Sequence, residues 1–182
     1  AAGTGLSTHE LNQPGAYRDV KDTTCVAQFK IKDPKPEMTG FGESYFLAWA
    51  TTPWTLPSNT ALAVGPDITY VAVRSYNPYS GAPITVVLAK WLMPSMFNEK
   101  AKDIALEDYK QGDKLIPYKV VGEWQGKELT GMHYEQLIPW MNPGEGAFKV
   151  VIGDFVTTDD GTGIVHIAPT FGADDAKVGK AN

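Results

Sequence analysis

An apolar stretch that runs directly into two prolines constrains the fold more than any other part of the sequence. Residues 45–50 are almost wholly apolar and are followed by Thr-Thr-Pro-Trp-Thr-Leu-Pro-Ser-Asn at residues 51–59. An apolar run of this length predicts a strand that is buried on both faces. Pro53 lacks a backbone N–H and favours an extended Thr52, so the strand is expected to end there. The threonines therefore lie where a strand leaves its sheet, and their hydroxyls can face a ligand.

Ordinary packing also explains this stretch. Threonine is a common strand residue, and a tight loop that packs Trp54 would account for the two prolines. On residue types alone this structural interpretation is the favoured one.

A second stretch, at residues 161–169, reads Gly-Thr-Gly-Ile-Val-His-Ile-Ala-Pro. It predicts a short strand in which Ile164, His166 and Ala168 share one face, and Pro169 ends that strand. A histidine among apolar neighbours is about as often a hydrogen-bonded core residue as a functional one. We expect this stretch to meet the first one in the folded protein and to form a pocket with it.

Two helices are predicted. Asp174 and Asp175 follow Gly172 and begin one of them, since carboxylates are favoured in the first turn of a helix. Residues 95–109 carry apolar side chains at helical spacing, with Ser95 as the N-cap, and predict an amphipathic helix that covers a sheet.

The remaining pattern predicts short strands separated by glycine and proline turns. These strands are expected at residues 25–31, 60–64, 68–74, 84–89, 118–123, 128–129 and 149–157. Many strands and few helices indicate an α/β fold with predominantly β content, a compact β-barrel with a few peripheral helices and hairpins.

The composition excludes several classes of protein. The single cysteine, Cys25, rules out an internal disulfide framework and is typical of a reducing compartment. No apolar run approaches the roughly 20 residues of a membrane span. The net charge of −5 argues against a free-standing nucleic-acid binder. We therefore expect a cytoplasmic protein without a membrane partner.

Common catalytic centres are not supported by the spacing of the residues. His9, His133 and His166 are far apart, and none is paired with a carboxylate in the way that zinc peptidases require. The chain also lacks a nucleophile elbow and a glycine-rich phosphate loop. No metal site is predicted.

Taken together, the two stretches resemble the editing (CP1) domain of isoleucyl-tRNA synthetases, in the class I aminoacyl-tRNA synthetase family. Residues 51–59 are similar to the threonine-rich motif of that family, and residues 161–169 with Gly172, Asp174 and Asp175 are similar to its second pocket motif. The valyl and leucyl enzymes usually carry Thr-Thr-Arg-Pro in the first motif and lack a histidine in the second. The resemblance extends over nearly the whole chain. It departs at Ala50, where the family often has a third threonine.

The resemblance implies a single editing domain, residues 1–182, excised from a larger synthetase. Residues 1–22 are expected to be a linker and residues 23–182 the globular core. The implied activity is post-transfer editing, the hydrolysis of the aminoacyl ester of valyl-tRNA(Ile), which maintains translational fidelity; valyl-adenylate is a second candidate substrate. An editing step is needed because a pocket for isoleucine rejects valine poorly.

The expected partners are the 3′ end of tRNA(Ile) carrying valine and the rest of the synthetase, and the domain is expected to be a monomer. No cofactor is expected in the domain, since ATP and zinc belong to the remainder of the parent enzyme. The aminoacylation site lies outside the chain as well.

The resemblance also implies the members of the pocket. They are the catalytic residues Thr51, Thr52 and Asp175, and the substrate-binding residues Trp54, Asn59, His166, Ala168 and Asp175.

Asp175 is expected to bind the α-ammonium group of the misattached amino acid. His166 and Trp54 would wall the side-chain pocket, with His166 excluding isoleucine. The two threonines and Asn59 would hydrogen-bond the ester, the terminal ribose or the attacking water.

Two other functions stay open. Ala50 allows a catalytically decayed tRNA-binding module, and a free-standing deacylase that acts in trans on mischarged tRNA is the second alternative.

Overall fold

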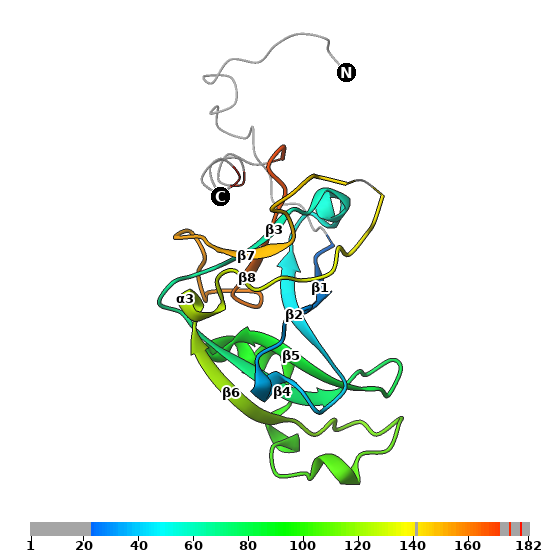
Figure 1. Ribbon diagram of the computed structural model, residues 1–182. Helices are drawn as coiled ribbons and strands as arrows, with labels where there is room; N and C mark the ends of the chain where they lie inside the picture. Colours follow the sequence, from blue (N-terminus) through cyan, green and yellow to red (C-terminus); the bar gives the residue numbers. More distant parts are fainter. Residues whose placement is uncertain (1–22, 141, 172–174, 176–178, 180–182) are drawn as a thin grey trace, which may run out of the picture.

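The computed structural model describes residues 23–140, 142–171, 175 and 179. Within these residues, eight strands form one sheet in the order β6-β4-β5-β2-β8-β3-β7, and β1 pairs with β2 outside this path. The sheet curls into a half-barrel, which confirms the predicted fold class (Figure 1). The strands are β1 (Cys25–Lys30), β2 (Glu43–Ala50), β3 (Ala61–Val64), β4 (Thr69–Tyr76), β5 (Pro83–Ala89), β6 (Lys119–Gln125), β7 (Lys149–Ile152) and β8 (Ile164–Ile167).

Strand β2 joins two groups of strands. Its first half pairs in parallel with β5, its end pairs in parallel with β8 through Trp49 and Val165, and its other edge pairs with β1 over six residues. Figure 1 shows β2 running from the group β4, β5 and β6 to the group β3, β7 and β8. The end of β2 therefore meets β8, and the two stretches predicted to meet do lie side by side.

Consecutive residues of β2 point into different apolar clusters. Phe46 is fully buried in the main cluster, which also contains Phe29, Leu62 and Tyr134. Leu47 packs on the other face with a cluster of β4 and β5 residues. The prediction of a strand buried on both faces is thus confirmed.

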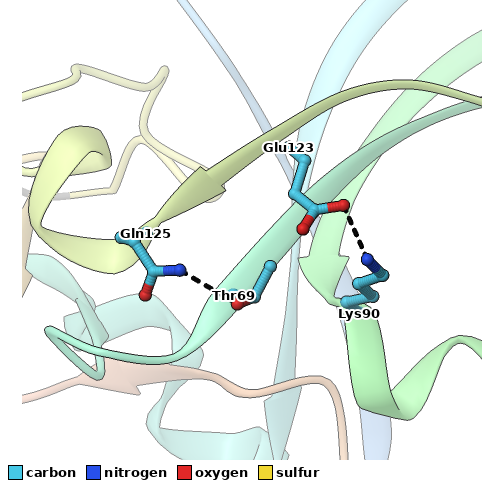
Figure 2. Close-up of polar contacts among 4 residues, drawn as sticks. All are labelled: Thr69, Lys90, Glu123 and Gln125. Atoms are coloured by element: carbon cyan, nitrogen blue, oxygen red, sulfur yellow. Dashed lines mark hydrogen bonds and ion pairs between the residues drawn. The ribbon is translucent and has the colours of Figure 1, made fainter.

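Two polar contacts, one partly buried and one exposed, join β6 to its neighbours (Figure 2). Gln125 Nε2 donates to Thr69 Oγ1 at 3.1 Å, and Lys90 Nζ lies 2.7 Å from Glu123 Oε2. Because the ion pair is exposed, we expect it to contribute less than about 1 kcal/mol.

The predicted helix over residues 95–109 is wrong. The segment contains only the end of α2 (Met93–Met96) and the short turns η4 (Glu99–Ala101) and η5 (Leu106–Asp108), and η3 (Lys90–Leu92) precedes it. Ser95 lies inside α2, where its Oγ donates to Leu92 O, and Phe97 is extended. A helix of that length needs a continuous buried face, and among residues 97–109 only Ala101 is buried. Phe97 nevertheless packs on the cluster that contains Leu47, so the segment does cover the sheet.

Two smaller predictions also fail. Residues 128–129 belong to a helical turn, α3 (Gly126–Leu129), and not to a strand, because Gln125 and Glu128 form a capping box. Strand β7 ends at Ile152, and the rest of the predicted strand 149–157 forms turns. A 3-10 helix also occurs at η1 (Pro36–Met38), where Met38 is buried.

The described residues contain no helix that is long and apolar enough to cross a lipid bilayer. Of the residues discussed above, the segment 1–22, Gly172 and Asp174 lie outside the described part of the chain.

Candidate functional site

A 3-10 helix, η2 (Pro53–Ser58), follows β2 and carries the threonine-rich motif. Thr52 precedes it as N-cap, and Pro53 occupies its first turn, where no backbone donor is needed. Thr55 N donates to Thr52 O at 3.0 Å, and Asn59 N donates to Leu56 O at 3.1 Å. The two prolines therefore shape a tight helical turn at the end of the strand.

A buried hydrogen bond joins η2 to β8. Thr55 Oγ1 lies 2.9 Å from Nε2 of His166, and the two residues are 5% and 7% exposed. The predicted pocket residue His166 therefore contacts a threonine that the sequence analysis left out of the site. Thr55 lies in the same motif as Thr51 and Thr52. Its place in that motif was the one sequence signal that could have indicated a role in the site.

Burial controls the charge of His166. Removal from water lowers the pKa of the imidazole below its ordinary value of 6.5, and the carboxylate of Asp175 opposes part of this shift. Nδ1 is buried and has no hydrogen-bond partner among the described residues. The imidazole is therefore neutral at neutral pH.

Asp175 closes the end of β8. Its Oδ2 accepts a hydrogen bond from Ala168 N at 3.2 Å, and among the described residues its carboxylate is the charged group that raises the pKa of His166. Ala168 is fully buried, and its backbone N–H is the group that holds the Asp175 carboxylate. The structure brings the predicted residues His166, Ala168 and Asp175 together.

Asn59 anchors the end of η2 to the core. Its Oδ1 accepts from Tyr134 OH at 2.6 Å, and its Nδ2 donates to Ala61 O at 2.9 Å. Both residues are buried, and burial raises the pKa of the Tyr134 hydroxyl. Asn59 is thus well placed to hold the loop, and its direct contact with a substrate stays a prediction.

The other predicted residues lie nearer the surface. Thr51 is exposed, Thr52 is half-buried, and Trp54 is 62% exposed. Thr52 Oγ1 lies 3.1 Å from Thr55 Oγ1, which links it to His166 through one hydroxyl. Trp54 is mostly exposed, and its role as a wall of the pocket stays a prediction.

The Gly-Thr-Gly turn positions β8. Gly161 and Gly163 have φ values of +78° and +72°, a region that favours glycine. Tyr70 OH donates to Gly163 O at 2.6 Å and accepts from Gly65 N at 3.0 Å. The start of β8 is therefore fixed from β4, a strand of the other group.

The described residues contain no group of three or more histidine, cysteine and acidic side chains that could hold a metal ion. A cavity of about 640 Å³ lies elsewhere, against β1, β4 and β5, and is lined in part by Cys25, Gln28, Ser75, Ile84 and Phe97. None of the predicted site residues lines it. The candidate site is therefore defined by its polar contacts and not by that cavity.

Known proteins resemble the chain over its whole length. It is 74% identical over 181 residues to the isoleucine–tRNA ligase of Bacteroides fragilis, covering 100% of the chain and 16% of that protein. It is 71% identical over 181 residues to the enzyme of Porphyromonas gingivalis, covering 99% of the chain and 16% of that protein. The chain belongs to the isoleucine–tRNA ligase family. It spans about 16% of the length of these relatives. No family model matches the chain.

Solved structures show where the fold occurs. The crystal structure of GlLeuRS-CP1 has a TM-score of 0.61 at 17% identity and matches 87% of this chain and 59% of its own. The cytosolic leucyl-tRNA synthetase editing domain of P. knowlesi has a TM-score of 0.61 at 11% identity, over 84% of this chain and 60% of its own. The resemblance to the isoleucyl family and to the editing-domain fold is therefore confirmed.

Proposed function

We propose that this chain is the editing domain of an isoleucine–tRNA ligase and that it hydrolyses the aminoacyl ester of valyl-tRNA(Ile). Its core would be residues 23–182, it would act as a monomer, and its partners would be the tRNA 3′ end and the rest of the ligase. One observation carries the proposal: a neutral, buried His166 and the Asp175 carboxylate meet at the end of β8, beside the hydroxyls of η2.

Asp175 supplies the charge that binds the amino acid. Its Oδ2 is held by the Ala168 N–H, and its other oxygen can accept from an ammonium group. An ammonium–carboxylate hydrogen bond is about twice as strong as a neutral one. The misattached amino acid would thus be placed by its α-ammonium, with its side chain toward β8.

His166 sets the size of the side-chain pocket. Its ring is buried and held at Nε2 by Thr55, so the ring has little freedom to move aside for a larger side chain. A neutral imidazole also adds no charge beside an apolar side chain. This rigidity supports the exclusion of isoleucine and the acceptance of valine.

Thr51 and Thr52 lie at the mouth of the site. Thr51 is exposed and Thr52 is half-buried, so both hydroxyls can reach an ester, a ribose or a water molecule. The site would act by positioning water next to the ester, without a covalent intermediate.

The departure from the family pattern at Ala50 does not weaken the proposal. Ala50 is 1% exposed, and it pairs with Cys25 in the sheet. The side chain at this position is covered by protein, so the missing hydroxyl is not one that the described surface would present to a ligand.

The test is deacylation of valyl-tRNA(Ile) and isoleucyl-tRNA(Ile), by the 182-residue chain and by a full-length ligase that carries it. We expect valine-selective hydrolysis, and we expect Asp175→Ala to lower kcat/KM by about 10- to 100-fold, the effect of one charged hydrogen bond. Asp67→Ala, in an exposed turn, is the matched control and should leave the rate unchanged. Valyl-adenylate is assayed in parallel as the second candidate substrate.

Two outcomes would contradict the proposal. Hydrolysis that is unchanged in Asp175→Ala would remove the assigned role of that carboxylate. No hydrolysis by either the chain or the full-length ligase would support a tRNA-binding module in place of an editing site.

A further inference from the structure

The Thr55 hydroxyl has three polar neighbours. Its Oγ1 lies 2.8 Å from Thr52 O, 3.1 Å from Thr52 Oγ1 and 2.9 Å from His166 Nε2. A hydroxyl carries one proton and two lone pairs, so it can donate once and accept twice. The three neighbours therefore use all the hydrogen bonds that the Thr55 hydroxyl can make, and each neighbour can be assigned as donor or acceptor.

The carbonyl oxygen of Thr52 decides the arrangement, because it can only accept. The single proton of Thr55 must then point to this oxygen. Both remaining neighbours must donate to Thr55: Thr52 through its hydroxyl proton and His166 through a proton on Nε2.

We propose that Thr55 is a positioning residue that holds His166 in its neutral Nε2–H tautomer and turns the Thr52 hydroxyl so that its lone pairs remain for a ligand. The inference depends on the proposed function only where it concerns hydrolysis. The tautomer is a property of the folded chain by itself.

The other protonation states of His166 fit the site less well. A proton on Nδ1 would be a buried donor without an acceptor among the described residues, since Nδ1 has no partner there. The Nδ1–H tautomer would also require Nε2 to accept the proton that Thr55 gives to Thr52 O. A doubly protonated ring would add a buried charge to the same unpaired donor.

The arrangement separates the tasks of the two residues during hydrolysis. The Nε2–H of His166 donates to Thr55 Oγ1, and its Nδ1 is buried away from solvent. His166 therefore shapes the pocket and does not take a proton from water. The hydroxyl of Thr52 donates its proton to a hydrogen bond with Thr55 Oγ1. Its lone pairs can therefore accept a hydrogen bond from the attacking water. A water that donates to Thr52 keeps its lone pairs for the ester carbon. In the hydrolysis its oxygen bonds to that carbon, the bond from the carbon to the ribose oxygen breaks, and the proton that the water loses ends on the ribose oxygen.

The first test needs no substrate. Two-bond ¹H–¹⁵N correlation spectra of the 182-residue chain show which ring nitrogen of each histidine carries the proton, and His166→Gln identifies the signals of His166 among the three histidines. We expect the proton on Nε2 in the unmodified chain. Thr55→Val removes the hydroxyl at nearly constant shape and should shift the ring toward a mixture of tautomers, whereas Thr55→Ser should retain the Nε2–H form.

The matched control is Thr69→Val, which removes the hydroxyl that accepts from Gln125 on the far group of strands (Figure 2). It should leave the His166 signals unchanged. A proton on Nδ1 in the unmodified chain, or a Thr55→Val spectrum identical to that of the unmodified chain, would overturn the inference. If Thr55→Val does not fold, the unmodified chain and Thr55→Ser still decide it.

The second test applies the same variants to valyl-tRNA(Ile) hydrolysis by the full-length ligase. Thr55→Val should lower kcat by about tenfold, the effect of one neutral hydrogen bond, and Thr55→Ser should restore most of it. Equal loss in both variants, or no loss in either, would overturn the positioning role. Since the spectra require no activity, a failure of the proposed function would leave the tautomer result standing.

Discussion

The two groups of strands that β2 joins are built in different ways. Strands β4, β5 and β6 pair over long antiparallel registers, and β4 and β5 align over seven residues. Strands β3, β7 and β8 are four residues long each, and buried polar side chains connect the loops around them. The long-strand group thus has the longer ladders, and the short-strand group adds buried hydrogen bonds from side chains.

The cavity of about 640 Å³ lies against the long-strand group, but the candidate site lies at the short-strand group. Each group holds one buried, unpartnered side-chain nitrogen among the described residues, Arg74 Nε and His166 Nδ1. Arg74 is only half-buried, and its Nη2 donates to Thr39 O, whereas the His166 ring is 7% exposed. The cavity of about 640 Å³ and the buried polar contacts of the candidate site thus lie at different groups of strands.

The largest expected effects come from cavities in the two groups. Leu62 and Leu88 are both fully buried, so Leu62→Ala and Leu88→Ala should each lower the free energy of unfolding by about 2–5 kcal/mol. Leu62 pairs with His166 across β3 and β8, so only its variant should shift the His166 ring signals. Chemical denaturation and ring spectra measure both effects. An equal shift in Leu88→Ala would show that the groups are not independent.

A smaller effect is expected at the hydroxyl that connects the groups. Tyr70 is fully buried on β4, and its hydroxyl accepts from Gly65 N and donates to Gly163 O at the short-strand group. Tyr70→Phe should therefore destabilise the fold by about 1–3 kcal/mol, since the Gly65 N–H and the Gly163 carbonyl each lose a buried hydrogen-bond partner. Burial raises the pKa of Tyr70 to about 12, so stability should also fall as the pH rises above about 10, where the unfolded chain ionises first.

The control for Tyr70 is Tyr76→Phe, whose hydroxyl donates to Leu106 O at a partly buried position within the long-strand group. Its loss should cost less than that of Tyr70, as measured by the same denaturation curves. An equal loss of stability in Tyr70→Phe and Tyr76→Phe would mean that the hydrogen bonds of Tyr70 contribute no more than an ordinary side-chain hydrogen bond.

The smallest effect is a pH dependence confined to the short-strand group. The folded pKa of His166 is lowered by burial, so below about pH 6.5 the unfolded chain binds a proton that the folded chain does not. Stability should fall with decreasing pH until the lowered pKa is passed. His166→Gln should reduce this acid sensitivity, as measured by denaturation curves over a range of pH. A slope of stability against pH that is identical in the unmodified chain and in His166→Gln would contradict the buried, neutral state of His166.

Alternating apolar patterns predicted most of the sheet, because the side-chain period of a strand is local. The same reasoning failed at residues 95–109, where helical spacing was present without a continuous surface to bury against. It failed again at residues 128–129, because the capping box of Gln125 and Glu128 outweighed strand propensity. Patterns thus predicted elements wherever the tertiary environment agreed with them.

The candidate site was predicted in part. The two motifs and their resemblance to one family pointed to His166 and Asp175, which do lie together. Thr55 was missed because a threonine in a proline-rich turn has an ordinary structural explanation. Its partner His166 is 111 residues away, and nothing local to either residue indicates the bond.

The sequence by itself determined where the strands of the site end and turn. Pro53 and Pro169 cannot continue a ladder, and Gly161 and Gly163 allow a backbone that other residues rarely adopt. Only the tertiary structure decided which polar groups meet: Thr55 with His166, Asn59 with Tyr134, and Tyr70 with Gly163. Steric limits act between neighbours in the chain, whereas a buried hydrogen bond requires that the curled sheet first bring distant residues into contact.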